Sequence, residues 1–139
     1  MRQDANSEGK KRRNITFGAP LEQKYGYTRA VKVGETVYVA GTIGLDPSTG
    51  TLPDDPTAQF HNAIGIIRRA LEEAGASLSE IVQLTTYVSA PEMFTEVVGP
   101  LLGETFGDIR PTNTALVVSF PWPGIALEIQ SIAVIGAKP

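Results

Sequence analysis

The pattern that most constrains the fold of this 139-residue chain is an amphipathic helix between Asp54 and Gly75. Asp54, Asp55 and Pro56 open it, because a carboxylate can accept hydrogen bonds from free amides and proline fits the first helical position. Gly75 stands where a helix commonly ends in a left-handed residue. Apolar residues between them recur at spacings of three and four and form one stripe: Phe60, Ala63, Ile64, Ile67, Leu71 and Ala74. One apolar stripe predicts a helix that lies on a sheet.

Strand patterns stand on both sides of this helix. Residues 30–41 contain two β-rich runs joined by Gly34 and Glu35, which is a hairpin pattern. Residues 81–88 are rich in β-branched and aromatic side chains, which favour strands. Two further apolar runs, 113–120 and 126–135, are separated by a turn-like Pro-Trp-Pro-Gly stretch and predict the last strands.

A second helix is predicted to begin at Pro91. Gly99 and Pro100 should kink it, because proline removes a backbone hydrogen bond and crowds the preceding turn. The order β-β-α-β-α-β-β predicts an α+β domain, with one mixed sheet carrying both helices on one face.

Apolar residues also fall on the other face of the predicted sheet. Val117, Ile129 and Ile132 or their neighbours would lie there. Because nothing in the single chain covers this face, we expect another copy of the chain to bury it.

Length and polarity predict the domain organisation. The polar residues 1–14, which include the basic run Lys10 to Arg13, are expected to form a flexible tail. Residues 15–139 are expected to form a single domain, because globular domains cluster at about 100–150 residues.

The composition argues against several partners and cofactors. A net charge of −3 supplies no excess positive field for a phosphate backbone, so we expect a small-molecule partner and no nucleic acid. The chain has no cysteine and one histidine, His61, so we expect no metal site and no cofactor. No apolar run approaches the about 20 residues that span a bilayer, and the start lacks a signal-peptide pattern. We therefore expect no membrane partner and a cytoplasmic location.

Four segments resemble, in order, the Rid family of small proteins, also called the YjgF family. Together they lie within a resemblance that runs from Ile15 to Ala133. YGYTRAV at 25–31 is similar to the family's GPYSQAV-like entry, VAGTIGLDP at 39–47 to its SGQIPLDP stretch, RPTNT at 110–114 to its P-A-R-S signature, and LEIQSIA at 127–133 to its VEIEAIA ending.

This resemblance implies a chorismate-mutase-like fold with a mixed six-stranded sheet and two helices on one face. It also implies a homotrimer with ligand clefts between the subunits. The activity it implies is hydrolytic enamine or imine deamination of a small metabolite.

The resemblance also implies site residues, with one departure. Glu128 matches the glutamate that positions or activates the water, whereas Asn113 occupies the position of the signature arginine that binds the substrate carboxylate. Asparagine can donate to a substrate oxygen but cannot neutralise a charge. Losing a charged partner costs about 1.5–3 kcal/mol per hydrogen bond, so an altered specificity is expected.

Further substrate-binding candidates are Tyr27, Arg29, Arg110 and Thr114. Either arginine could replace the missing cation, and the alternative for both is an ion pair at the surface or between subunits. The other candidates also have purely structural alternatives. Glu128 could form a salt bridge at a subunit interface, Tyr27 could simply pack in the fold, and Asn113 could hydrogen-bond to its own backbone.

Two functions remain open from the sequence. The first is a deaminase of altered specificity that uses Glu128, and the second is a non-catalytic trimer that binds a small metabolite. Endoribonuclease activity, which is attached to some family members, is not expected because the chain offers no histidine pair and no basic groove.

Overall fold

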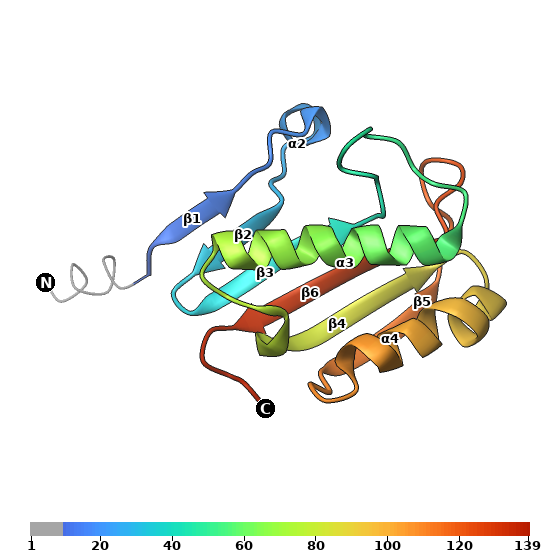
Figure 1. Cartoon of the computed structure of the whole chain (residues 1–139). Coiled ribbons are helices and arrows are strands. Elements are labelled where there is room, and N and C mark those ends of the chain that lie inside the picture. Colours follow the sequence, from blue (N-terminus) through green and yellow to red (C-terminus); the bar gives the residue numbers. More distant parts are fainter. Residues whose placement is uncertain (1–9) are drawn as a thin grey trace, which may run out of the picture.

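The computed structural model describes residues 10–139 (Figure 1). The strands are β1 (Arg12–Ile15), β2 (Ala30–Val33), β3 (Thr36–Thr42), β4 (Ile81–Val88), β5 (Thr112–Val117) and β6 (Leu127–Val134). The helices are α2 (Pro20–Tyr25), α3 (Pro56–Glu73) and α4 (Gly99–Phe106), with a 3₁₀ turn η1 (Leu78–Glu80) and a π-helix η2 (Met93–Val98).

The six strands form one mixed sheet in the order β1-β2-β3-β6-β4-β5. The pair β4–β5 is parallel and the other neighbouring strands are antiparallel. Helices α3 and α4 lie on the same face of this sheet (Figure 1). The predicted α+β architecture with a mixed sheet is confirmed, whereas the homotrimer stays a prediction.

Helix α3 begins and ends where the sequence predicts. The Asp55 side chain accepts a hydrogen bond from the Thr57 amide, and Gly75 follows the helix with φ +82°. The apolar stripe is buried over its whole length, since Phe60, Ile67 and Leu71 are each 0% exposed. α3 therefore anchors the core against the central strands.

A fully buried polar residue, Gln59, ties α3 to two loops. Its Nε2 donates to the carbonyl oxygens of Pro53 (2.8 Å) and Gly124 (2.9 Å), and its Oε1 accepts from the Ala126 amide (2.9 Å). Gly44 lies so close to this residue that an added Cβ would overlap the Gln59 backbone. These contacts hold the loop before β6 against the helix.

The kink predicted at Gly99 and Pro100 takes the form of a change in helical register. η2 closes with the Gly99 amide donating to the Phe94 carbonyl oxygen, which is the i to i−5 bond of a π-helix. Pro100 then occupies the first turn of α4, where the absent proline N–H costs no helical hydrogen bond.

Two elements near the start were not predicted. Residues 12–14, which were expected in a flexible tail, pair with β2 as part of β1. Strand β1 is an edge strand, where charged side chains such as Arg12 and Arg13 remain in solvent. Helix α2 is only one and a half turns long, too short for a periodic pattern to show. The part of the tail prediction that concerns residues 1–9 lies outside the described residues.

Two residues placed on the uncovered face, Ile129 and Val117, were assigned wrongly. Ile129 is 0% exposed and lies in the core under the helices. Its neighbours Glu128 and Gln130 therefore point to the opposite face, because side chains alternate along a strand. Val117 pairs with the buried Val88, so it lies on the helix side of β5 although it is 55% exposed. Ile132 lies on the uncovered face, as predicted.

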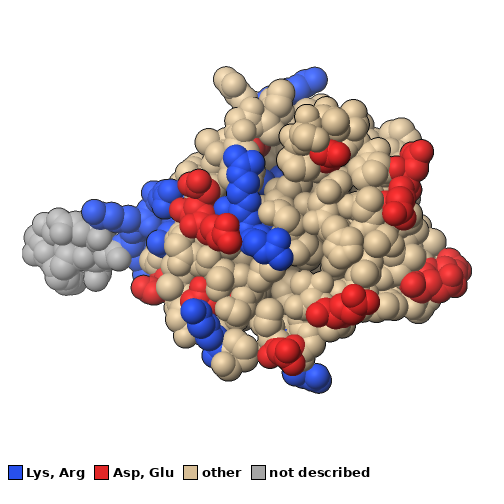
Figure 2. Space-filling view, in the orientation of Figure 1, with Lys and Arg blue, Asp and Glu red and all other residues tan. Residues whose placement is uncertain are grey.

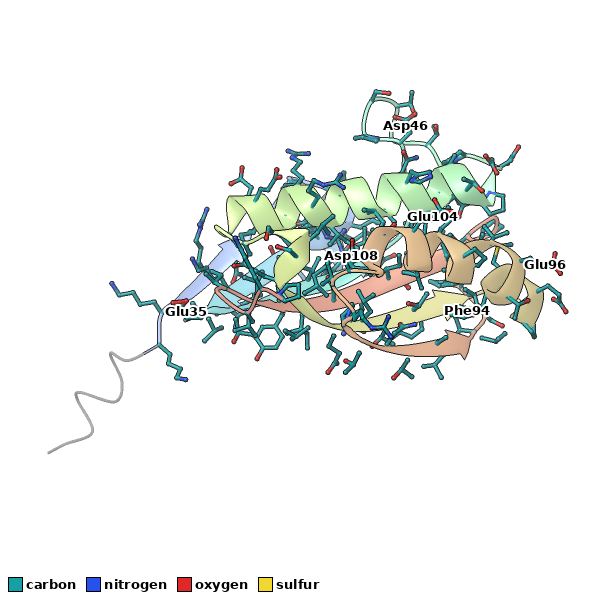
Figure 3. The ribbon with its side chains drawn as sticks, turned by 60° about the horizontal axis from the view of Figure 1, so that its bottom comes forward. Glu35, Asp46, Phe94, Glu96, Glu104 and Asp108 are labelled. Atoms are coloured by element: carbon teal, nitrogen blue, oxygen red, sulfur yellow. The ribbon has the colours of Figure 1, made fainter. Side chains whose placement is uncertain are left out.

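The face of the sheet away from the helices carries exposed side chains (Figure 3). On this face Leu116 of β5 is 45% exposed and Tyr38 of β3 is 49% exposed. Val82 of β4 is a further large apolar residue that stays exposed. This apolar content supports the expectation of a covering copy.

Charges on the helix-covered face are mixed in sign. Figure 2 shows lysine and arginine side chains toward the β1 end, interspersed with acidic groups, and acidic side chains along the opposite rim. One exposed ion pair, Arg13 with Glu73 at 3.8 Å, joins β1 to α3. Within residues 10–139, no helix is both long and apolar enough to cross a membrane.

We predict that Gln59→Leu lowers the free energy of unfolding by about 2 kcal/mol, because it leaves the buried Ala126 amide without a partner and removes two part-buried hydrogen bonds to carbonyl oxygens. Chemical denaturation measures the change. Gln23→Leu, on the exposed side of α2, is the matched control and should change little. An unfolding free energy for Gln59→Leu equal to that of the control would contradict the assigned role.

Candidate active site

A cavity of about 540 Å³ opens where α2, the end of β3 and the loop before β6 meet. It contains three of the side chains predicted for the site, Tyr27, Arg29 and Glu128. The rest of its wall is mainly apolar and includes Pro20, Leu21, Tyr25, Ile43, Leu45, Ile66, Phe120, Trp122 and Ile125. The cavity is therefore the candidate active site.

A bulge in β3 shapes the floor of this cavity. The register between β3 and β6 shifts between Val39 and Thr42, so β3 has one residue more than its partner there. Gly41 lies in this bulge, and a Cβ on it would stand 2.8 Å from Glu128 Oε2. The carboxylate can occupy its position because residue 41 has no side chain.

Glu128 is a half-buried carboxylate in the middle strand β6. Its neighbours Leu127 and Ile129 are 0% exposed in the core, so strand alternation directs Glu128 away from the helices. Burial raises the pKa of the Glu128 carboxyl above its ordinary value, and the nearby positive charge of Arg29 partly opposes that rise. A carboxyl with a raised pKa is suited to exchanging protons near neutral pH.

Arg29 enters the same cavity from the residue just before β2. Its Nη2 donates to the Gly41 carbonyl oxygen at 2.8 Å, so it also braces the bulge. Burial lowers the pKa of Arg29, while Tyr27, Glu22 and Glu128 act in the opposite sense. Among residues 10–139, no carboxylate oxygen lies within 4.0 Å of its guanidinium nitrogens.

Two aromatic side chains stand at the rim of the cavity. Tyr27 follows the left-handed Gly26 (φ 73°) that ends α2, and it is 43% exposed. Trp122, in the loop before β6, is 48% exposed. The sequence named Tyr27 as a candidate and placed Trp122 only in a turn-like stretch. It did not indicate Leu21 and Tyr25, because α2 itself was not predicted.

Asn113 and Arg110 line a different hollow, of about 330 Å³, between β5 and α4. Asn113 Oδ1 accepts a hydrogen bond from the buried Thr86 hydroxyl at 2.8 Å, so its amide oxygen is already engaged. Arg110 follows α4 with φ 57°, a left-handed conformation uncommon for arginine. Thr114 is exposed on β5 and lines neither hollow. A single chain thus brings Tyr27, Arg29 and Glu128 together but leaves the other three apart.

Within the described residues 10–139, no three histidine or carboxylate side chains gather in a group that could hold a metal ion.

The fold and the site define a small α+β protein that holds a carboxylate in a mainly apolar cavity. Comparison with known proteins identifies its family. The family model described as Endoribonuclease L-PSP matches residues 18–135. A crystal structure from Mycobacterium tuberculosis, of a member of the YjgF/YER057c/UK114 family, has a TM-score of 0.81 at 35% identity and covers 90% of this chain and 100% of that one. The chain belongs to this family, the YjgF or Rid family, as its motifs predicted.

Two relatives extend the comparison. A RutC family protein of Pyrococcus abyssi is 36% identical over 108 residues, which are 77% of this chain and 84% of the relative. The 2-iminobutanoate/2-iminopropanoate deaminase of Mus musculus is 31% identical over 111 residues, which are 79% of this chain and 82% of the enzyme. The family of this chain thus includes imine deaminases.

The raised pKa of Glu128 predicts a pH-dependent cost in stability. Because the folded protein favours the protonated carboxyl, stability falls as the pH rises above the unfolded pKa of about 4.3 and through the higher folded pKa. Glu128→Gln should therefore raise the melting temperature by a few degrees at pH 7, and the gain should vanish as the pH falls below about 4.

Thermal unfolding followed across this pH range measures the difference. The control is Glu104→Gln on the exposed surface of α4, which should show no such trend. A Glu128→Gln variant that is no more stable than the wild type at pH 7 would argue against a carboxyl strained by burial.

Proposed function

We propose that this protein is a hydrolytic imine or enamine deaminase of altered specificity, acting on a small metabolite. The observation that carries the proposal is Glu128, a carboxyl held in a ligand-sized cavity with a raised pKa beside Arg29. Membership of a family that includes 2-iminobutanoate/2-iminopropanoate deaminases supports the same reaction class.

Glu128 supplies the proton transfers that this reaction needs. The reacting species is the protonated imine. As a carboxylate Glu128 takes a proton from water while the water oxygen bonds to the imine carbon and the C=N π electrons move to the nitrogen, which gives a neutral carbinolamine. The carboxylic acid then returns its proton to the nitrogen and the C–N bond breaks. The carbinolamine hydroxyl passes its proton to the departing ammonia, so ammonium and a carbonyl compound leave and Glu128 is again a carboxylate. A pKa raised by burial lets the same group serve in both directions.

The reaction would take place at clefts between the subunits of a homotrimer. The uncovered sheet face supports this assembly, because its exposed apolar residues include Tyr38, Val82 and Leu116. The separation of Asn113 from Glu128 supports it as well, since Asn113 is on the α4 side of the sheet. A neighbouring subunit could place its residue 113 near the cavity that holds Glu128.

One observation favours a second candidate, a trimer that binds a small metabolite without converting it. Asn113 carries no charge, and its Oδ1 is occupied by the Thr86 hydroxyl. Residue 113 therefore cannot provide the bidentate charged contact that orients a carboxylate for reaction. In this alternative the cavity keeps its binding role and Glu128 only contributes a polar contact.

The endoribonuclease named in the family description is not the function that the site favours. The single histidine, His61, lies exposed on α3 with its ring edge-on to Phe60 at 5.6 Å. Figure 2 shows basic side chains mixed with acidic ones toward the β1 end and acidic ones along the opposite rim, whereas RNA contact requires a continuous basic surface.

We predict that Glu128→Gln lowers the rate of imine hydrolysis by at least about a hundredfold, because glutamine cannot exchange the proton. Ammonia release is measured from imines freshly generated from neutral, acidic and aromatic amino acids. Glu104→Gln removes a carboxylate from the exposed surface and should keep full activity. Equal turnover by the wild type and Glu128→Gln would exclude the proposed role of Glu128.

A gain-of-function variant separates the two candidates. If the rest of the machinery is present, Asn113→Arg should increase turnover of short 2-imino acids by about tenfold or more, because a guanidinium adds charged hydrogen bonds to the substrate carboxylate. The same ammonia assay measures it. Absence of turnover in both the wild type and Asn113→Arg would favour the metabolite-binding candidate.

A further inference from the structure

Arg29 is a cation enclosed in the cavity wall without an ion-pair partner among the described residues. One of its five N–H groups, on Nη2, is bound to the Gly41 carbonyl oxygen. Its Nε is buried and has no hydrogen-bond partner in residues 10–139. Enclosed arginines are usually paired, because removing an unpaired charge from water is costly. The remaining face of the guanidinium is therefore suited to an anion that enters the cavity.

Two carboxylates, Glu22 and Glu128, act electrostatically on Arg29 without forming an ion pair with it. Glu22 is only 6% exposed and its Oε1 accepts from the Thr16 hydroxyl at 2.7 Å. Glu128 packs against Gly41. Both favour the charged form of Arg29, yet neither lies within 4.0 Å of its nitrogens. A direct anionic contact to Arg29 would have to come from a ligand or from another chain.

The rest of the cavity wall is apolar and therefore favours ligands with apolar groups. Leu21, Ile43, Leu45, Phe120 and Trp122 surround the polar end formed by Arg29 and Glu128. A four-carbon imino acid has about seven non-hydrogen atoms. If each atom is given the volume of a water molecule in the liquid, about 30 Å³, the whole molecule fills about 210 Å³. That is less than half of the cavity volume of about 540 Å³.

We propose that Arg29 binds the substrate carboxylate in this protein, in place of the cation missing at residue 113, and that the preferred substrates are 2-imino acids with a large apolar side chain. The guanidinium holds the carboxylate beside Glu128, and the apolar wall takes the side chain. This inference rests on the proposed function for the reaction, but the binding contact it assigns is testable without turnover.

The test uses the 2-oxo acids that such imines would yield as products. The probes are 4-methyl-2-oxopentanoate, pyruvate and the neutral ketone 4-methylpentan-2-one, which keeps the apolar group but lacks the carboxylate. Trp122 is the only tryptophan of the chain and lines the cavity, so its fluorescence reports occupancy there. Calorimetric titration gives the affinities.

The variants are Arg29→Gln, Arg29→Lys and the control Arg68→Gln, which removes a cation from the exposed side of α3. We expect Arg29→Gln to bind 4-methyl-2-oxopentanoate about tenfold or more weakly, since charged hydrogen bonds contribute about 1.5–3 kcal/mol. Arg29→Lys should retain part of the affinity, which would show that the loss follows the charge and not misfolding. Binding of the neutral ketone should be the same in all variants, and pyruvate should bind more weakly than the larger acid.

Equal affinity of the wild type and Arg29→Gln for 4-methyl-2-oxopentanoate would overturn the assignment of Arg29, as would no binding of this acid by the wild type. Equal affinity for pyruvate and the larger acid would overturn the preference for a large side chain. Arg29-dependent binding without any ammonia release would instead reject the proposed deaminase reaction and leave the carboxylate contact standing.

Discussion

The one-sided burial of the sheet is the constraint on which the rest of this structure depends. Two helices cover one face of six strands, and the apolar stripe of α3 is buried over its entire length. Because side chains alternate along a strand, every residue of β6 that is not in this core must point to the other face. The same rule that buries Leu127 and Ile129 therefore brings Glu128 out of the core.

A bulge and a glycine in β3 provide the space that the Glu128 side chain occupies in the cavity. A regular β3 would carry a side chain at residue 41 against the Glu128 carboxylate, but the bulge and Gly41 provide the space. Arg29 braces the bulge through the Gly41 carbonyl, so the cation and the carboxylate are held by the same stretch of backbone. On the far side, Gln59 fixes the loop before β6, which carries Trp122. Charge and shape in the cavity thus derive from the packing of the core.

The asparagine at residue 113 and the arginine at residue 29 bear on the same question, which is where this chain carries a cation for its site. Asn113 faces α4 and bonds to Thr86, whereas Arg29 stands in the cavity with Glu128. A family member that has an asparagine at the signature position still has an arginine beside its carboxylate. The proposed binding group, just before β2, and the proposed proton-transfer group, on β6, then belong to one subunit, with β3 between the two strands. The neighbouring subunit that we propose would only close the cleft.

The sequence by itself determined the main elements, because periodicity and capping are local: α3 begins at Pro56 as Asp55 indicates, and β4 spans the predicted residues 81–88. The motifs determined the family and named Glu128, Arg29 and Tyr27. Tertiary structure alone decided that these three share a cavity while Asn113 and Arg110 do not. It also decided the face on which Ile129 lies and the course of β1 and α2. These depend on strand register, on a one-residue bulge and on contacts between distant segments, none of which leaves a periodic trace in the chain.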